Sequence, residues 1–113
     1  MHELSVVESI IDIAAEMVQT HHATSVDSIE LEVGELAGID VSALEFAWDV
    51  SIQDTVLEHA ERKIDHKNGR ARCLVCNQEF EIVQYFDKCP NCGSFKKDIL
   101  GGNELKVKRI TLT

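Results

Sequence analysis

The chain has 113 residues, room for one domain or a small domain with a metal-stapled lobe, and its 20 Asp and Glu against 11 Lys and Arg give a formal net charge of -9. Such an acidic chain is poorly suited to hold a phosphate backbone, and it suits a protein that binds cations or basic partner surfaces. No stretch is long and apolar enough to span a bilayer, and the N-terminal segment lacks the basic residues of a signal peptide. We therefore expect a cytoplasmic protein with no membrane or nucleic-acid partner, whose four cysteines stay reduced.

The first predicted element is an amphipathic helix. Apolar residues recur every three or four positions with acidic residues on the other side, so a helix is expected from about Glu3 or Leu4 to His21. A polar link follows. Residues 28–33 then alternate polar and apolar side chains, which is typical of a half-buried strand.

A second helix is expected after a loop bounded by glycines at residues 34–39. Asp40 or Ser42 should cap it, the latter because residues 42–45 have the form of a capping box. Its apolar positions continue to about Asp54.

Two further strands flank the cysteine-rich segment. Residues 57–67 are strand-like though charged, and Asn68-Gly69 ends that pattern. The last strand, residues 105–112, changes its apolar parity between Val107 and Ile110, which implies a bulge or two buried faces. The order predicts an α+β fold: a small three-stranded sheet with two helices, carrying an inserted zinc-ribbon lobe built on the four cysteines. The expected domains are an α/β domain of residues 1–68 with 99–113 and a zinc-binding lobe at 69–98.

All four cysteines fall into two C-x-x-C pairs, Cys73 with Cys76 and Cys89 with Cys92. Two such turns supply four thiolates, a complete tetrahedral shell for Zn(II) that leaves no position for water or substrate. The predicted role is therefore structural. Two disulfides would suit a secreted chain, and a single C-x-x-C could be a redox pair, but a matched set of four favours zinc.

The first three residues, Met1-His2-Glu3, form a candidate metal site. The amine, the deprotonated amide nitrogen of His2 and the imidazole Nδ1 together form two fused chelate rings, a planar nitrogen set that Ni(II) or Cu(II) favours. One planar position stays open, which suits a protein that must release its metal. A backbone nitrogen or the carboxylate of Glu3 could fill it, or a residue brought in by the fold, such as Asp40.

Each of these residues also has a simpler interpretation. A histidine near the chain start usually lies on a solvated end, and Asp40 alone is more often a helix cap than a ligand. His21, His22, His59 and His66 have no Cys, Asp or Glu at a clear metal-ligand spacing. The sequence has no phosphate loop and no nucleophile beside a base.

Three sets of residues together resemble the HypA/HybF family of hydrogenase-maturation nickel chaperones. They are Met1-His2-Glu3-Leu4-Ser5; Glu32-Val33-Gly34-Glu35-Leu36 with Gly38 and Asp40; and the four cysteines with Cys89-Pro90-Asn91-Cys92-Gly93. The resemblance covers essentially the whole chain. One departure is that no histidine lies within residues 70–97, so a histidine-based pH switch in the zinc lobe is not expected.

The resemblance implies a non-enzymatic protein that receives Ni(II) and passes it toward the large subunit of a [NiFe]-hydrogenase. It implies His2 as the essential nickel ligand, Met1 and Glu3 as neighbouring donors, Asp40 close by, and Zn(II) on the four cysteines. The GTPase HypB and the hydrogenase large subunit are the implied partners. Some family members also serve urease, so urease maturation proteins are a second implied class. Glycine hinges near Asn68-Gly69 and Gly101-Gly102 also allow a homodimer that exchanges a strand or lobe.

Two other functions fit parts of the sequence. A zinc-ribbon interaction module, even one for nucleic acid, would use the cysteines, but the acidic charge opposes binding to a phosphate backbone. A thiol redox enzyme would use one C-x-x-C pair, and its thiols would titrate freely in the folded, metal-free protein.

Overall fold

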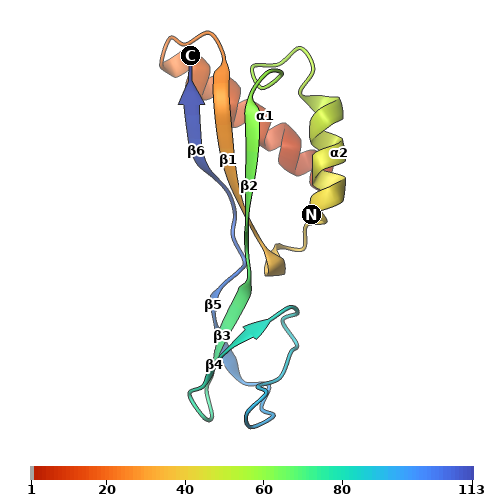
Figure 1. Cartoon of the computed structure of the whole chain (residues 1–113), viewed down its shortest axis with the longest axis vertical. Coiled ribbons are helices and arrows are strands. Elements are labelled where there is room, and N and C mark those ends of the chain that lie inside the picture. Colours follow the sequence, from red (N-terminus) through yellow and green to blue (C-terminus); the bar gives the residue numbers. More distant parts are fainter. Residues whose placement is uncertain (1) are drawn as a thin grey trace. The chain divides into compact units, whose positions relative to one another are not determined.

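A computed structural model describes residues 2–113, and Met1 lies outside the described residues. The chain divides into two compact units. Unit 1 comprises the chain up to Leu31, Gly38–Asp65 and Lys106–Thr113, and unit 2 comprises Glu32–Ala37 and His66–Leu105. The elements, labelled in Figure 1, are α1 (Glu3–Thr20), β1 (Val26–Gly34), the 3-10 turn η1 (Glu35–Ala37), α2 (Val41–Ser51), β2 (Glu61–Lys67), β3 (Gly69–Cys73), β4 (Glu79–Ile82), β5 (Lys97–Gly101) and β6 (Leu105–Leu112).

Helix α1 forms where the apolar spacing predicted it. Its buried face consists of Val6, Val7, Ile10, Ala14 and Val18. The helix ends at Thr20, where the N–H of His21 donates to the Met17 carbonyl and His22 takes a left-handed φ of 52°. Packing of this apolar face, rather than any capping side chain at its start, stabilises the helix.

A three-stranded sheet in the order β2-β1-β6 carries both helices, as the sequence predicted. Strand β1 is its most buried strand, with Val26, Ile29 and Leu31 inside unit 1. In Figure 1 both helices lie on one side of this sheet, and α1 contacts α2. Elsewhere the strands expose charge: Glu30 on β1 lies 3.7 Å from Lys63 Nζ on β2 and 3.9 Å from Arg109 Nη1 on β6.

Helix α2 begins at one of the two predicted caps and ends earlier than predicted. Asp40 is the N-cap, with its carboxylate accepting from the Ala43 N–H at 3.2 Å, so the capping box that begins at Ser42 is not used. The helix ends at Ser51 rather than near Asp54, which adopts a left-handed φ of 63°. Burial of Leu44 and Trp48 holds α2 against the core.

The strand predicted from residue 57 begins only at Glu61. Residues 57–60 form turns, held by the N–H of Glu58 donating to the Thr55 carbonyl and that of Ala60 donating to Leu57. Leu57 is completely buried. Its apolar side chain therefore fills the core from a turn instead of starting a strand.

Unit 2 has its own sheet, in the order β4-β3-β5 with antiparallel pairing on both sides of β3. Its buried apolar residues are few: Val33, Leu36, Ala71 and Ile82, besides Cys73 and Cys89. Phe80 and Ile99 are half-buried against Leu36, Ala71 and Ile82. A core this small contributes little burial free energy, so a metal cross-link suits the unit.

Three glycines of unit 2 meet backbone to backbone. A Cβ on Gly34 would overlap the Gly102 carbonyl, and a Cβ on Gly102 would overlap Gly69 and approach the Asn68 oxygen to 2.7 Å. Gly102 also has a left-handed φ of 95°. Only glycine fits this contact.

Strand β6 shows the predicted change of parity. Burial alternates from Leu105 to Val107, is interrupted by two successive exposed residues, Lys108 and Arg109, and resumes at Ile110. No described helix is long and apolar enough to cross a membrane.

Candidate metal centre

The first C-x-x-C pair forms a tight turn at the end of β3. The Cys73 N–H donates to the Gln78 carbonyl at 2.9 Å, and the Asn77 N–H donates to the Cys73 carbonyl at 3.0 Å. The N–H groups of Val75 and Cys76 lie 3.4 and 3.5 Å from the Cys73 sulfur. Asn77 takes the left-handed conformation, φ 63°, that such a sharp turn requires.

The second pair repeats this backbone. The Cys89 N–H donates to the Ser94 carbonyl at 2.9 Å, and the Gly93 N–H donates to the Cys89 carbonyl at 2.9 Å. Gly93, with φ 78°, occupies the position that Asn77 has in the first turn. The sequence repeat C-x-x-C is therefore also a repeat of backbone hydrogen bonds, and each turn presents two sulfurs.

The four sulfurs gather at one point. The Sγ atoms of Cys73 and Cys92 are 3.5 Å apart, those of Cys76 and Cys89 are 3.6 Å apart, and all four lie within 4.8 Å of one another. A disulfide would need about 2.05 Å. Thiolates around a tetrahedral Zn(II), each at about 2.3 Å, would lie about 3.8 Å apart, so the cluster fits that ion.

Hydrogen bonds prepare two of these cysteines to ionise. The N–H of Cys76 lowers the pKa of the Cys73 thiol. The Asn91 side chain, together with the Gln78 N–H, lowers the pKa of Cys76 to about 6. A thiolate is the form that binds a metal, so these donors favour the liganding state.

Cys92 shows the opposite effect. The Ser94 N–H favours its thiolate, but the nearby sulfurs of Cys73, Cys76 and Cys89 and partial burial outweigh that bond and raise its pKa to about 11. Four thiolates this close repel one another unless a cation neutralises them. The donor set therefore matches a divalent metal better than four free thiols.

The described nickel candidates, His2, Glu3 and Asp40, lie in unit 1. His2 is exposed and extended, with φ -82° and ψ 136°, and its side chain makes no capping hydrogen bond to α1. Its carbonyl accepts from the Val6 N–H at 3.2 Å, so the backbone is fixed while the imidazole is not engaged in the helix. Glu3 is half-buried in the first turn of α1, and the candidate Met1 lies outside the described residues.

Asp40 caps a helix and also has a carboxylate oxygen that is available as a metal ligand. One carboxylate oxygen caps α2, and the second has no partner among residues 2–113. In Figure 1 the red start of α1 lies on the α2 side of the sheet, which agrees with the contact between the two helices. The two caps, His2 and Asp40, therefore begin helices that pack on each other.

The remaining histidines are surface residues, and one has a partner that the sequence did not suggest. His66 on β2 lies 3.0 Å from a Glu35 carboxylate oxygen in η1. The two residues come from different elements of unit 2, so no local spacing could have indicated the pair. Among the residues that the structure describes, only the four cysteines form a group of three or more potential metal ligands.

The chain resembles known proteins over almost its whole length. A family model described as "Hydrogenase/urease nickel incorporation, metallochaperone, hypA" matches residues 1–112. The chain is 41% identical over 110 residues to the hydrogenase maturation factor HypA of Francisella philomiragia, covering 97% of each chain. It is 39% identical over 108 residues to that of Alkalilimnicola ehrlichii, covering 96% of each.

Solved structures show the same fold. The solution structure of the Ni metallochaperone HypA from Helicobacter pylori superposes with a TM-score of 0.69 at 24% identity, over 99% of this chain and 97% of that one. A second structure, described as the solution structure of HypA protein, has a TM-score of 0.69 at 25% identity, over 100% and 97%. The chain belongs to the HypA family of hydrogenase and urease nickel-incorporation metallochaperones.

Proposed function

We propose that the chain binds Ni(II) at its N-terminus and delivers it for maturation of a [NiFe]-hydrogenase. The membership in a nickel-incorporation family supports this function. The exposed His2 imidazole, which makes no hydrogen bond to the helix that it begins, carries the assignment of the site. His2 supplies the imidazole Nδ1 and its amide nitrogen, Met1 supplies the amine, and Glu3 and Asp40 are the candidates for the remaining position.

The four cysteines hold Zn(II) in this proposal. The sulfur spacing and the paired turns support a closed tetrahedral site with no position for substrate. Zinc then cross-links the segments at Cys73–Cys76 and Cys89–Cys92 of unit 2, whose hydrophobic cluster is small. The metal contributes folding free energy, and the site performs no catalysis.

The proposed partners follow from the proposed role in nickel delivery. Nickel must come from or pass through other proteins, and the GTPase HypB and the hydrogenase large subunit are the proposed partners. Urease maturation proteins are a second class, because the family description includes urease. No enzymatic activity is assigned to the chain itself.

A nickel titration tests the assignment of the two sites. Untagged, zinc-loaded protein and its His2→Ala variant are titrated with Ni(II) by calorimetry, and zinc is counted in both. We expect the variant to lose tight nickel binding and to keep its zinc. His59→Ala is the matched control, because the His59 side chain is 90% exposed, lies in a turn and belongs to neither proposed ligand set. Equal nickel affinity in the parent and the His2→Ala variant would refute the N-terminal site.

A thiol titration separates the zinc assignment from a redox function. Zinc-held thiolates should react slowly with a thiol reagent until a chelator removes the metal. Free titration of all four thiols in a folded, metal-free protein would contradict the structural zinc site.

A further inference from the structure

The outer face of α2 is apolar, although it is not covered by the rest of the chain. The helix buries Leu44 and Trp48, yet Phe46 and Val50 on its other side are 73% and 59% exposed. These two residues are one helical turn apart and so lie next to each other on the surface. A surface helix normally carries polar residues there. Clustered large apolar side chains of this kind mark interaction sites.

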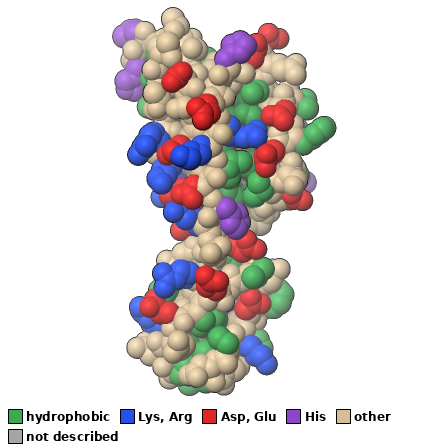
Figure 2. Space-filling view, viewed as in Figure 1, with side chains coloured by type: hydrophobic (Ala, Val, Ile, Leu, Met, Phe, Trp, Pro, Cys, Tyr) green, Lys and Arg blue, Asp and Glu red, His purple; other side chains and the backbone are tan. Residues whose placement is uncertain are grey.

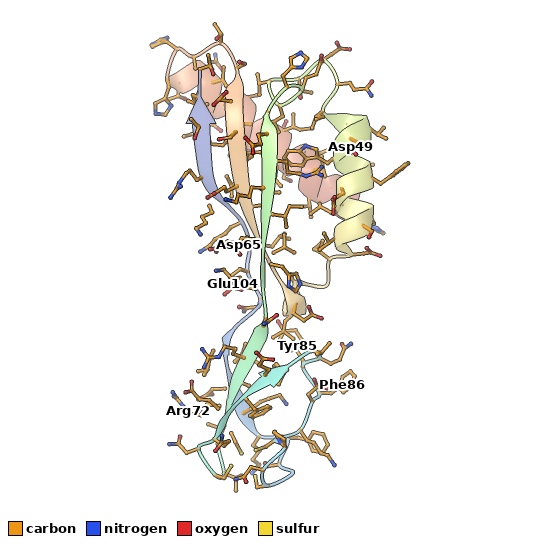
Figure 3. All side chains as sticks on the ribbon, viewed as in Figure 1. Asp49, Asp65, Arg72, Tyr85, Phe86 and Glu104 are labelled. Atoms are coloured by element: carbon orange, nitrogen blue, oxygen red, sulfur yellow. The ribbon has the colours of Figure 1, made fainter. Side chains whose placement is uncertain are left out.

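The residues beside this pair are held in place by Arg62 from β2. Its guanidinium donates to Glu45 at 3.2 Å and to Asp49 at 3.3 Å, and it lies 5.9 Å from the centroid of the Trp48 ring. Figure 3 labels Asp49 on α2. These contacts fix α2 against β2. Phe46 and Val50 therefore stand on a rigid support, which lowers the entropy lost when a partner binds.

The helices that form this surface carry no basic residue. Every Lys and Arg of the chain lies at position 62 or later. On α1, the exposed residues Glu8, Asp12 and Glu16 have no ion pair within residues 2–113. Figure 2 shows most of the Lys and Arg of unit 1 over the sheet, interspersed with acidic side chains, whereas hydrophobic side chains gather toward α2.

We propose that the exposed faces of α1 and α2, centred on Phe46 and Val50 and here called the helical surface, dock a basic amphipathic segment of a partner protein. Its apolar side chains pack on Phe46 and Val50, and its Lys and Arg face the carboxylates of α1. The negative charge of the two helices excludes other classes of binding partner at this surface. A second copy would bring the same acidic helices face to face, and nucleic acid or anionic lipid would be repelled. Binding at this surface does not require nickel, so a result that refutes it would leave the proposed metal sites unaffected.

Unit 2 provides the matched control for this surface. Phe86 is 71% exposed and Val83 is 57% exposed, nearly the values of Phe46 and Val50. Phe86, labelled with Tyr85 in Figure 3, lies in the turn after β4. Lys88 and Lys96 lie in this part of the chain, so its surroundings are not uniformly acidic. Removing the same two side-chain types here tests apolar exposure without the acidic setting.

The test uses the full, zinc-loaded protein and two labelled peptides, followed by fluorescence anisotropy. One peptide is a designed helix with Leu at helical spacing and Lys at all other positions, and the other has Glu in place of Lys. We expect the Lys peptide to bind and the Glu peptide not to bind. Changing Phe46→Ala with Val50→Ala should weaken binding at least about tenfold, whereas Val83→Ala with Phe86→Ala should change it less than about twofold.

Three outcomes would overturn the proposal. Equal weakening by both double variants would show that binding is not centred on α2. Equal binding of the Glu peptide would remove the charge argument. A parent that sediments as a dimer while the α2 double variant sediments as a monomer would identify a second copy as the occupant. Circular dichroism and the zinc content of each variant confirm that the fold is retained.

Discussion

Two different substitutions at Asp40 can separate its roles as a helix cap and as a proposed nickel ligand. Its carboxylate caps α2 by accepting from the Ala43 N–H, and the proposal for nickel uses the same group. An N-cap contributes about 1 kcal/mol, which corresponds to about 4–8 °C in Tm for a domain of this size. Asp40→Ala should therefore lower the Tm of the zinc-loaded protein by that amount.

Asp40→Ser removes the carboxylate but keeps a capping oxygen, since serine caps about as well as aspartate. We expect its Tm to stay within about 2 °C of the parent, because the difference in capping is a few tenths of a kcal/mol. If Asp40 contributes a nickel donor, both variants should bind Ni(II) about tenfold more weakly, a loss of about 1.4 kcal/mol.

Differential scanning fluorimetry and nickel calorimetry on the same samples measure both effects. An unchanged Tm in Asp40→Ala would refute the capping argument. Full nickel affinity in Asp40→Ser would show that the residue is a cap and no ligand.

Three further predictions concern unit 2. Cys76→Ser, or chelation of zinc, should unfold this unit while α1 and α2 persist, because the hydrophobic cluster of unit 2, Leu36, Ala71 and Ile82, is small. Amide exchange in unit 2 alone should accelerate, and unchanged protection would contradict the role of zinc. Asp87→Ala should accelerate exchange of the Val83 and Gln84 amides, which donate to its carboxylate at 2.8 and 3.1 Å. Those bonds lower the pKa of Asp87. The stability that they contribute is therefore fully present above the ordinary carboxyl pKa of about 3.9 and is lost only in acid. Protection of the Val83 and Gln84 amides against exchange should not change between about pH 6 and 8. Gly102→Ala should destabilise the protein by about 1–3 kcal/mol, because the added Cβ would overlap Gly69. Gly101→Ala is the control and should have little effect, because its Cβ would meet no atom closer than 3.4 Å. Urea unfolding measures both, and equal midpoints for the two variants would refute the close glycine contact.

The helix α1 and the cysteine pairs were predictable because their signals are local. Helical periodicity depends on residues three and four apart, and a C-x-x-C turn is complete within a few residues. The parity change in β6 was readable for the same reason. These features needed no knowledge of what packs against them.

The choice of cap that the sequence left open at the start of α2, and the wrong start predicted for β2, have a different origin. Asp40 and Ser42 both have capping side chains, and only the extended backbone at Asp40 decides between them. Leu57 resembles the apolar start of a strand, but it is buried from a turn in which the Thr55 hydroxyl donates to the Ile52 carbonyl at 2.6 Å. Such side chain–backbone bonds compete with regular structure and leave no periodic pattern.

The contacts that no local pattern could indicate join distant residues. Gly34, Gly69 and Gly102 read separately as turn residues, although the fold brings them together. Arg70 and Glu79 look like ordinary surface charges, although they pair across β3 and β4 at 3.4 Å. The domain limits predicted from the sequence and the nickel ligands stay predictions that the experiments above address.

The absence of Lys and Arg before residue 62 also determines where trypsin can cleave. The protease cuts only after those residues, so α1, β1 and α2 contain no site, and the first site along the chain is Arg62. Most sites lie in β2, the cysteine-rich segment and β6. Limited proteolysis with trypsin therefore detects opening of the strands and of the cysteine-rich segment, and it does not detect opening of the helices. A rapid loss of intact chain after chelation, with one large N-terminal fragment persisting, would read out the folding of unit 2 without any label.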